Sequence, residues 1–196
     1  MERWKNYYLG KQDILTKTYH DTTKPCGHVV TNFCKNITDI YAGYIAAPSC
    51  ITYQSEKDIS LVIQALKYND ASTEDVELLR NALIYGVGSE IMFIDNKKEI
   101  RFSVVDSLTS FPIYSSDLTG DLLYFVNWTR NNNWNFQTQE YTLNVFDDKN
   151  VTTYTMTGEG GALTLLEKKR HYFSQCPANV FYIQDEKSIF DCIMSL

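Results

Sequence analysis

The sequence predicts an α+β fold, with N-terminal helices followed by a mainly antiparallel or mixed β-sheet. Up to about residue 87, apolar residues recur every three or four positions, which is the period of an amphipathic helix. From Glu90 onward, apolar and polar residues alternate between short turn-forming stretches, which is the pattern of strands. The 14 Tyr and 10 Phe also favour a sheet over a bundle of helices.

With 196 residues, the chain is long enough to enclose a hydrophobic core of its own. We therefore expect residues 1–196 to form a single domain, which the changes of pattern divide into parts. These parts are an N-terminal arm at about 1–29, a helical part at about 30–87, a β-rich part at about 88–186 and the start of a truncated helix at 187–196.

A central helix is predicted between Val29 and Pro48, which stops it because proline lacks an N–H. One side of this helix is expected to be buried, since its apolar residues follow steps of three and four: Val30, Phe33, Cys34, Ile37, Tyr41 and Tyr44. The other side is expected to face solvent and carries Thr31, Lys35, Asn36, Thr38 and Asp39.

The remaining elements of the first half are expected in this order: an arm helix with Trp4, Tyr7 and Tyr8 on one face, a strand at 50–55, a helix at about 57–69 and a helix from Ser72 to Gly86. Val62 is expected on the buried side of the 57–69 helix. Ser72 is expected to cap the last helix, because its hydroxyl can accept from a free N–H of the first turn. Gly86 ends it, because glycine tolerates the left-handed conformation of a helix C-terminus.

The β-rich part is expected to contain roughly six to eight strands. It opens with a hairpin around the turn at 95–98. Pro112 makes the segment 107–116 irregular or an edge strand, because proline cannot donate to a sheet ladder. Further strands are expected at 122–130, 137–148, 151–158, 162–173 and 179–184, the first three as a meander. For 162–173 a strand is preferred to a short helix.

Composition and charge argue against several classes of function. A net charge of −6 is unsuited to a tight nucleic-acid binder, which needs clustered Lys and Arg. No apolar run has the length that spans a membrane, so no membrane partner is expected. The five cysteines are odd in number and scattered, which predicts free thiols in a reducing cytoplasm: Cys26, Cys34, Cys50, Cys176 and Cys192.

The best candidate for a metal site is the group His20, Cys26, His28 and Cys34. Structural zinc ligands come in close pairs that hold the ion from one turn, and this group has no such pair. Cys34 also falls on the predicted buried side of the central helix, where a thiol is an ordinary core residue. We expect no metal and no cofactor.

Candidate catalytic groups are equally poor. A nucleophile and base could be formed by Cys176 and His171 or by Cys26 and His28, but the sequence shows no strand-turn-helix elbow around either cysteine. Asp147 and Asp148 precede Lys149 and Asn150 between alternating segments, which predicts a hairpin turn rather than a carboxylate pair. We expect the thiols and these carboxylates to be structural.

One aromatic group resembles a nucleic-acid platform: Trp128, Arg130, Trp134 and Phe136. Aromatic rings interleaved with a cation can stack bases. A single Arg is a poor guide for a phosphate backbone, however, and the alternation around it favours core or interface positions for most of the rings.

Three ordered segments carry a family resemblance. The segment from Tyr7 to Leu15 has the pattern YY-x-G-x-x-x-I, and a helix later leads to Asn81–Asp95, NALIYGVGSEIMFID. Between them stand Val30, Asn32, Ile37, Asp39, Gly43, Tyr44, Pro48 and Tyr53. This ordered set over roughly half the chain resembles the N-terminal part of a tailed-phage portal protein of the siphophage type. Ala46-Ala47 departs from the family pattern, which often has a glycine there.

The resemblance implies the wing region of a structural head–tail connector, with no enzymatic activity. It implies a dodecameric ring in the full-length protein, located at the portal vertex of the virion and in the host cytoplasm during assembly. The implied partners are the terminase, scaffold or capsid proteins, head-completion proteins and double-stranded DNA that passes without sequence specificity. The arm residues expected at a subunit interface are Trp4, Tyr7, Tyr8 and Ile14, although the same residues could pack on their own domain.

Two other classes remain open at this point. A small cytoplasmic hydrolase that uses a thiol or a carboxylate would show a deep cleft with converging polar groups. An unrelated phage interaction module would show a different order of helices and strands. A portal wing would show flat aromatic patches on opposite sides.

The last residues predict a helix that is cut short, because Ile189, Phe190 and Ile193 have helical spacing without a following cap. We therefore expect the chain to be a piece of a longer protein, and the piece to be monomeric or weakly associated.

Overall fold

The structure is a computed structural model, and it describes residues 1–18, 27–48, 50–131, 139–158, 160–183 and 186–191. The helices in these ranges are α1 (Glu2–Tyr8), the 3₁₀ helix η1 (Asp13–Thr16), α2 (Phe33–Ile45), α3 (Ser60–Tyr68) and α4 (Ala71–Tyr85). The strands are β1 (Val87–Ile94), β2 (Ile100–Val105), β3 (Ser110–Tyr114), β4 (Leu122–Asn131), β5 (Glu140–Phe146), β6 (Asn150–Thr157), β7 (Leu163–Arg170) and β8 (Ala178–Tyr182).

Helices come first and antiparallel strands follow, so the predicted α+β class is confirmed. The described strands form two sheets rather than one. A three-stranded sheet has the order β2-β1-β8, and a five-stranded sheet has the order β3-β4-β5-β6-β7. The five-stranded sheet is a meander of consecutive strands, whereas β8 returns from the end of the chain to pair with β1.

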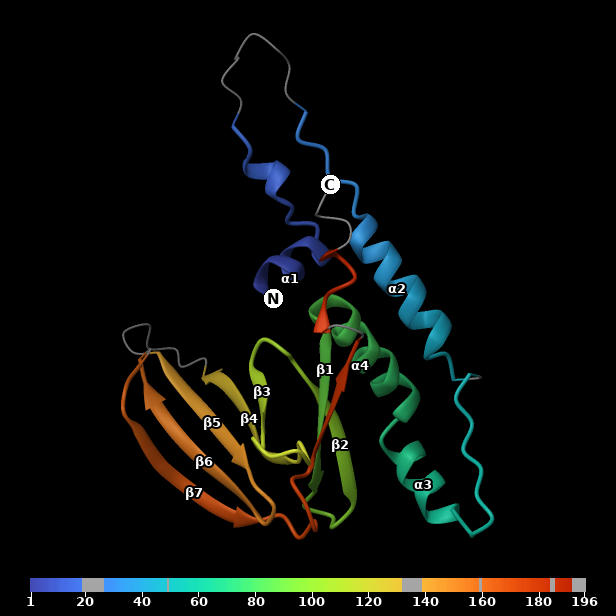
Figure 1. Ribbon diagram of the computed structural model, residues 1–196, viewed down its shortest axis with the longest axis vertical. Coiled ribbons are helices and arrows are strands. Elements are labelled where there is room, and N and C mark those ends of the chain that lie inside the picture. Colours follow the sequence, from blue (N-terminus) through green and yellow to red (C-terminus); the bar gives the residue numbers. More distant parts are fainter. Residues whose placement is uncertain (19–26, 49, 132–138, 159, 184–185, 192–196) are drawn as a thin grey trace.

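These elements stack in four layers (Figure 1). Helix α2 packs on α4, α4 packs on the three-stranded sheet, and that sheet packs on one end of the five-stranded sheet. Helix α1 lies against both α2 and α4. The two outermost layers are therefore a helix on one side and a sheet on the other.

Two glycines set the close contact between α4 and β1. Gly86 adopts a positive φ of 84° at the helix C-terminus, as predicted, and turns the chain directly into β1. A Cβ atom on Gly88 would come within 2.6 Å of the Leu78 carbonyl oxygen, so any side chain at this position would push the strand off the helix.

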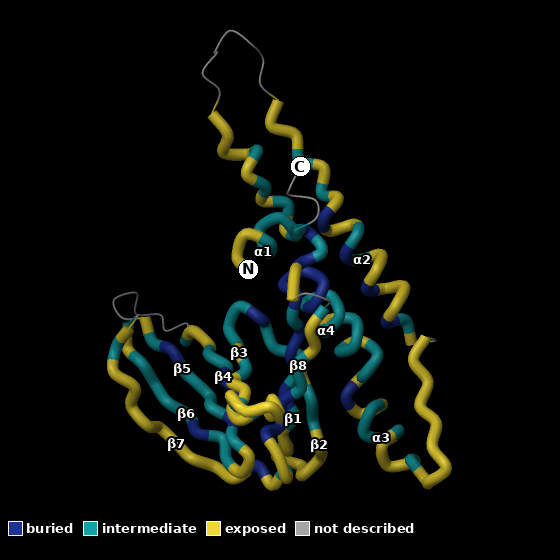
Figure 2. Tube along the Cα trace, in the orientation of Figure 1, coloured by how far each residue is buried: buried dark blue, intermediate teal, exposed yellow. Residues whose placement is uncertain are grey.

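Two hydrophobic clusters hold the layers together, and Figure 2 shows which parts of the chain are buried. The first joins the two sheets and contains Ile91, Phe125, Phe146, Cys176 and Ala178. The second joins the helices and contains Cys34, Ile84, Tyr85 and Phe190. Phe125 and Phe190 are fully buried, so each cluster is closed around one phenylalanine ring.

Helix α2 corrects the sequence-based prediction most strongly. Its buried positions are Cys34, Thr38, Ala42 and Ala46, which follow one another at steps of four. Thr38 was expected to face solvent but is fully buried, and its hydroxyl donates to the Cys34 carbonyl oxygen at 2.9 Å. Small side chains let the backbones of α2 and α4 approach closely. Close packing of the two helices therefore stabilises the fold more than burying the larger residues of α2 would.

The prediction of a strand at 50–55 is wrong. Residues 51–55 are exposed and pair with no described strand. The edge strands of the three-stranded sheet are β2 and β8, and neither of them pairs with this segment. The predicted cap Ser72 lies inside α4, and Asp70 in a left-handed conformation (φ 49°) occupies the N-cap position instead. Helix α3 forms where expected, but Val62 is 53% exposed rather than buried.

The β-rich predictions are largely confirmed. The β1–β2 hairpin turns at Asp95, whose side chain accepts hydrogen bonds from the N–H groups of Lys97 and Glu99. Strand β3 is an edge strand and contains Pro112. The segment predicted at 162–173 forms strand β7. Of the helix predicted at 187–196, residues 192–196 lie outside the described residues, and Ser188 and Phe190 are buried.

Candidate interaction surfaces

The five-stranded sheet has one apolar face, which the strand registers define. Side chains that are paired across strands share a face, and one such row crosses from β4 to β7 through Trp128, Leu143, Tyr154 and Leu165. Together with the equivalent positions along the strands, the apolar members of the face are Phe111, Ile113, Tyr124, Val126, Trp128, Tyr141, Leu143, Val145, Tyr154, Met156, Leu163 and Leu165; the same registers place Arg130, Thr152 and Lys168 at its borders. We call these residues the outer sheet face.

The opposite face of the same sheet is polar over most of its area. Its middle rows are ladders of Asn and Thr, in which the Thr153 hydroxyl donates to the Asn144 side-chain oxygen at 2.9 Å. At one end a row of Phe125, Phe146 and Val151 joins the cluster between the sheets. The sheet is thus attached through one end of its polar face, and its apolar face points away from the rest of the chain.

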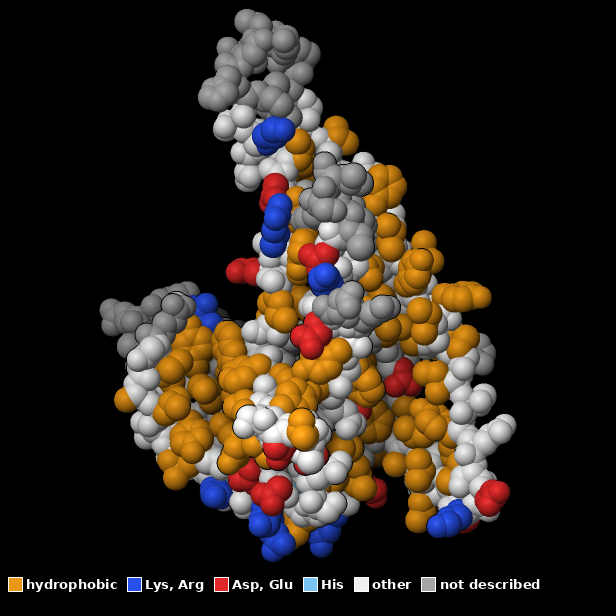
Figure 3. Space-filling view, in the orientation of Figure 1, with side chains coloured by type: hydrophobic (Ala, Val, Ile, Leu, Met, Phe, Trp, Pro, Cys, Tyr) orange, Lys and Arg blue, Asp and Glu red, His pale blue; other side chains and the backbone are white. Residues whose placement is uncertain are grey.

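The outer sheet face is not covered by any helix or second sheet in the described part of the chain. Phe111, Tyr124, Leu163 and Leu165 are each between 44% and 58% exposed. Figure 3 shows hydrophobic side chains gathered over the five-stranded sheet on one side of the molecule. In the middle of the face the rings shield one another, as where Trp128 packs edge-on against Tyr141 at 5.7 Å.

A second exposed apolar surface runs along α2. It comprises Phe33, Ile37, Ile40, Tyr41 and Tyr44, and we call it the outer helix stripe. These positions are separated by four, three, one and three residues, which places them on one side of the helix, away from the small residues that contact α4. Apart from the half-buried Ile37, they are 55–81% exposed, and Figure 3 shows hydrophobic side chains along this edge of the molecule.

Asn32 fixes the start of α2. Its side-chain oxygen accepts from the Lys35 N–H at 3.2 Å, which caps the first turn of the helix. Its side-chain nitrogen donates to the Tyr8 carbonyl oxygen at 3.0 Å, which ties the helix to the arm. The outer helix stripe is therefore carried by a helix that is anchored at its N-terminus.

Asp39 links α2 to the elements on either side of it. It accepts hydrogen bonds from Lys35 at 2.5 Å, from the Tyr8 hydroxyl at 2.8 Å and from Arg80 on α4 at 3.3 Å. Partial burial opposes its ionisation, but the hydrogen bonds from Lys35 and Tyr8 and the charges of Lys35 and Arg80 prevail and hold the pKa of Asp39 below its ordinary value. This network fixes α2 against the arm and α4 on the side away from the outer helix stripe.

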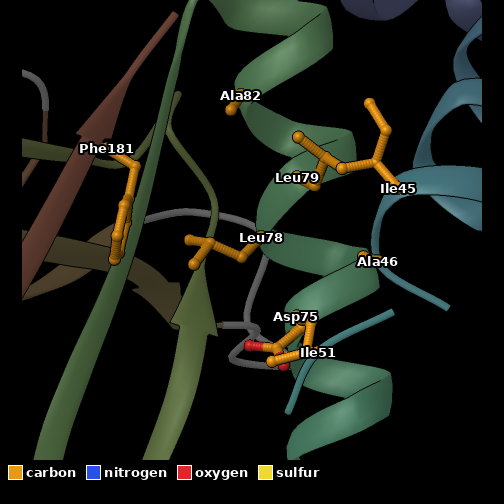
Figure 4. Close-up of a pocket in the computed structure, with 8 residues that line it drawn as sticks. All are labelled: Ile45, Ala46, Ile51, Asp75, Leu78, Leu79, Ala82 and Phe181. Carbon is orange, nitrogen blue, oxygen red and sulfur yellow. The ribbon is translucent and has the colours of Figure 1, made fainter. Parts of the chain in front are cut away.

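An apolar pocket of about 280 Å³ opens at the C-terminal end of α2 (Figure 4). It is lined by Ile45, Ala46, Ile51, Asp75, Leu78, Leu79, Ala82 and Phe181, and Figure 4 shows the Ile45 and Leu79 side chains pointing toward each other. Burial raises the pKa of the Asp75 carboxyl. Asp75 is the only ionisable side chain among the described residues that line the pocket, and catalysis needs a second group such as a base or a nucleophile. The pocket is therefore better suited to binding an apolar side chain than to catalysis.

The arm residues predicted at a subunit interface lie against their own chain. Trp4, Tyr7 and Tyr8 pack on the helical cluster, and the ring of Trp4 meets that of Phe190 edge-on at 6.4 Å. Ile14 lies in η1 and is half-buried, and its carbonyl oxygen is 2.7 Å from Nδ1 of His28. None of the four side chains is fully buried, so a contact with another subunit stays a prediction.

The candidate catalytic groups are structural. His171 is buried, with Nε2 3.0 Å from the Asp147 carbonyl oxygen and Nδ1 accepting from the Phe173 N–H. The Cys176 thiol donates to the Phe146 carbonyl oxygen at 3.6 Å, and burial raises its pKa to about 11, so it is a poor nucleophile. Asp147 accepts from the N–H groups of Lys149 and Asn150 in the β5–β6 turn.

Other candidates bring no chemistry together. Among the described residues, no three His, Cys, Asp or Glu side chains are placed to hold a metal ion; His20 and Cys26 lie outside them. Trp134 and Phe136 of the aromatic group also lie outside the described residues. A second pocket, of about 590 Å³ between α3 and the β1–β2 turn, is lined by no Cys or His. No described helix has the length and apolar character needed to cross a membrane.

The outer sheet face and the outer helix stripe were missed as surfaces by the sequence analysis. The residues themselves were recognised as apolar, but the strands' partners and the direction of α2 were unknown. A signal for α2 does exist in the sequence, since four small residues at steps of four mark a close helix contact and leave the large residues outside.

The chain was compared with models of known protein families. The family model described as phage portal protein, SPP1 Gp6-like, matches residues 1–196, which is the full length of the chain. A search of curated proteins finds no match.

Proposed function

Because the chain belongs to the SPP1 Gp6-like family of phage portal proteins, we propose that it is a subunit of the closed portal ring of a tailed phage, through which DNA is packaged and ejected. The observation that carries this proposal is the family match, which extends over the full 196 residues. Membership makes the protein a phage structural component, a role that needs no bond-making chemistry.

The two exposed apolar surfaces support the ring. A ring of identical subunits needs heterologous contacts, in which one surface of each copy meets a different surface of the next. The chain offers two such surfaces on its outermost layers, the outer sheet face and the outer helix stripe. A single apolar surface would instead favour a two-fold dimer.

Within this role we propose a ring of twelve subunits at one vertex of the capsid in the full-length protein. The terminase would pass double-stranded DNA through it without reading sequence, and scaffold or capsid proteins and head-completion proteins would attach to its outside. The net charge of −6 supports passage rather than tight binding, because few phosphates would be neutralised along the channel.

The arm is proposed to add a second contact between neighbours. Trp4, Tyr7, Tyr8 and Ile14 keep part of their apolar surface in contact with solvent. Helix α1 is joined to the rest by a few fixed points, including the Lys5–Asp106 ion pair at 2.7 Å. A neighbouring copy could cover these half-buried rings without displacing them from their own cluster.

A hydrolase, the competing class, has little to support it in the described residues. The apolar pocket contains one carboxyl, Asp75, and the thiol of Cys176 and the ring of His171 are held in separate structural hydrogen bonds. No observation here favours an enzyme over a structural subunit.

Electron microscopy of the purified full-length protein tests the proposal. We expect closed rings with a central opening, and we expect a phage in which the gene is deleted to form capsids that contain no DNA. Particles that stay monomeric at every concentration, together with normally filled capsids in the deletion, would refute the portal role.

A further inference from the structure

We propose that the outer sheet face of one copy docks on the outer helix stripe of the next copy. This inference rests on the proposed ring and specifies the contact that builds it. It assigns an occupant to each of the two uncovered surfaces, namely a second copy of this chain.

The layer order places the two surfaces correctly for such a contact. The outer sheet face belongs to the sheet at one end of the order of layers, and the outer helix stripe belongs to the helix at the other end (Figure 1). With α4 and the three-stranded sheet between them, the two surfaces cannot reach each other within one copy. They can meet only between copies, and each copy then still has one free surface for the next.

The sizes of the two surfaces agree. Five strands at about 4.8 Å spacing make the sheet face about 19 Å wide. The outer helix stripe from Phe33 to Tyr44 is about 17 Å long at about 1.5 Å per residue. A single helix can therefore cross all five strands.

The helix stripe limits the area of the contact. It is about 17 Å long and about 10 Å wide, so it covers roughly 170 Å² of the roughly 400 Å² sheet face before the relief of the side chains is counted. A standard interface takes about 800 Å² from each partner. One such contact therefore gives weak association of two copies, and a closed ring, in which every copy makes two contacts, is more stable.

The shape of the surfaces favours a helix on the sheet over two sheets face to face. Tyr41 and Tyr44 project from α2, and the sheet face carries its tallest rings at Trp128 and Tyr154 in its central row. Inside this chain the small residues of α2 pack on α4, which leaves the large ones as the part that can insert between the rows of a sheet.

A pair of surface variants tests the inference. In full-length protein, Leu165→Lys puts a charge on the outer sheet face and Tyr44→Glu puts one on the outer helix stripe; both residues are exposed, at 58% and 81%, so the fold should tolerate them. We expect each variant alone to self-associate at least about tenfold more weakly, because the contact would desolvate an unpaired charge. Mixed together, they should form one-to-one pairs, since each keeps the surface that the other has lost.

The matched controls lie on or directly beside the same elements. Thr164→Lys places the same charge on the polar face of β7, and Thr31→Glu places it on the exposed residue directly before the N-cap of α2, away from the outer helix stripe. Both should associate like the wild type. Circular dichroism and the unfolding midpoint of all four variants verify the fold, and sedimentation equilibrium measures the association.

The other outcomes are distinct. If Leu165→Lys prevents association, Tyr44→Glu has no effect and mixing does not restore pairs, the contact is sheet to sheet and the inference is overturned. If the wild type associates and neither variant matters, the inference fails while the ring proposal stands. If the full-length wild type does not associate at all, the ring proposal fails and the inference with it.

Discussion

Gly88 lies where β1 crosses α4, and the space for a side chain there is taken by the Leu78 carbonyl oxygen. We predict that Gly88→Ala lowers the free energy of unfolding by about 1–3 kcal/mol, because the added methyl group would force backbone apart in a packed layer. Urea denaturation followed by circular dichroism measures this change. The matched control is Gly43→Ala in α2, where nothing lies within 4 Å of the added atom.

For Gly43→Ala the expected sign is opposite. Alanine in a helix interior is more favourable than glycine by roughly 0.5–1 kcal/mol. Equal effects of the two substitutions would contradict the structure, since they would mean that β1 does not pass so close to α4.

Asp75 supplies a second prediction at the residue scale. Burial beside Ile51 and Leu78 raises the pKa of its carboxyl, so the charged form is disfavoured in the folded state. Stability contributed by a raised pKa is present at low pH and is lost as the pH rises through the folded pKa. We therefore predict that Asp75→Asn raises the thermal midpoint at pH 7, and that the gain shrinks toward pH 4.

Thermal scans at both pH values measure this difference. Glu77→Gln, two residues along α4 and 58% exposed, is the control and should change stability by less than about 0.5 kcal/mol. A gain for Asp75→Asn that is the same at pH 4 and pH 7 would argue against a desolvated charge.

At the scale of the element, α2 shows what a periodic pattern does and does not determine. The pattern correctly predicted a helix and its end before Pro48, because these depend on local backbone preferences. It did not determine which side is buried, because α2 has apolar residues on more than half of its circumference. The buried side is determined by the contact with α4, against which the small residues Thr38 and Ala42 pack closely.

This assignment leads to a prediction for α2. We expect Ala42→Leu to destabilise the protein by about 1–3 kcal/mol, because Ala42 is completely buried at the contact with α4 and a larger side chain would overpack it. Ile40→Ala, on the outer helix stripe, should change the stability of the isolated chain by less than about 1 kcal/mol. Chemical denaturation measures the free energy of unfolding of both variants. A larger loss for Ile40→Ala than for Ala42→Leu would mean that the side of α2 expected from the sequence is the buried one.

The strands were predicted more completely than the helices' contacts. Alternation and turn residues such as Asp95 and Pro112 are local signals, and they identified the hairpin, the edge strand and the meander. The pairing of β8 with β1 joins residues about ninety positions apart, and no local signal encodes it. The split into two sheets arises because β2 does not pair with β3 and β7 does not pair with β8, and no local signal encodes that either.

At the scale of the whole molecule, the same reasoning explains why the family could be recognised while the interaction surfaces could not. The family resemblance rests on the order of short segments around Tyr8, Asp39 and Gly86. These residues have structural roles, since Tyr8 donates to Asp39, Asp39 pairs with Arg80, and Gly86 ends α4. An interaction surface is defined by what is left uncovered after packing. It becomes visible only when the layers are assembled.

The molecule as a whole should be sensitive to acid. Carboxylates whose pKa is lowered occur in nearly every layer and turn: Asp13, Asp39, Asp58, Asp95, Asp117 and Asp147. For Asp95 the first cause is the hydrogen bond from the Glu99 N–H, and for Asp117 it is the hydrogen bond from the Ser115 hydroxyl. A lowered folded pKa contributes stability above the ordinary value of 3.8, and this stability is lost as the pH falls through the folded pKa.

We therefore predict a thermal midpoint that is nearly constant between neutral pH and about pH 5 and falls steeply below about pH 4. The variant Asp95→Asn separates this effect from a general increase in positive charge. Asparagine keeps an acceptor for the turn N–H groups but not the charge, so the variant should be less stable than the wild type at pH 7 and should approach it at pH 3. If the difference between the two proteins stays constant across this range, the ionised Asp95 carboxylate does not stabilise the β1–β2 turn, and the acid sensitivity has another origin.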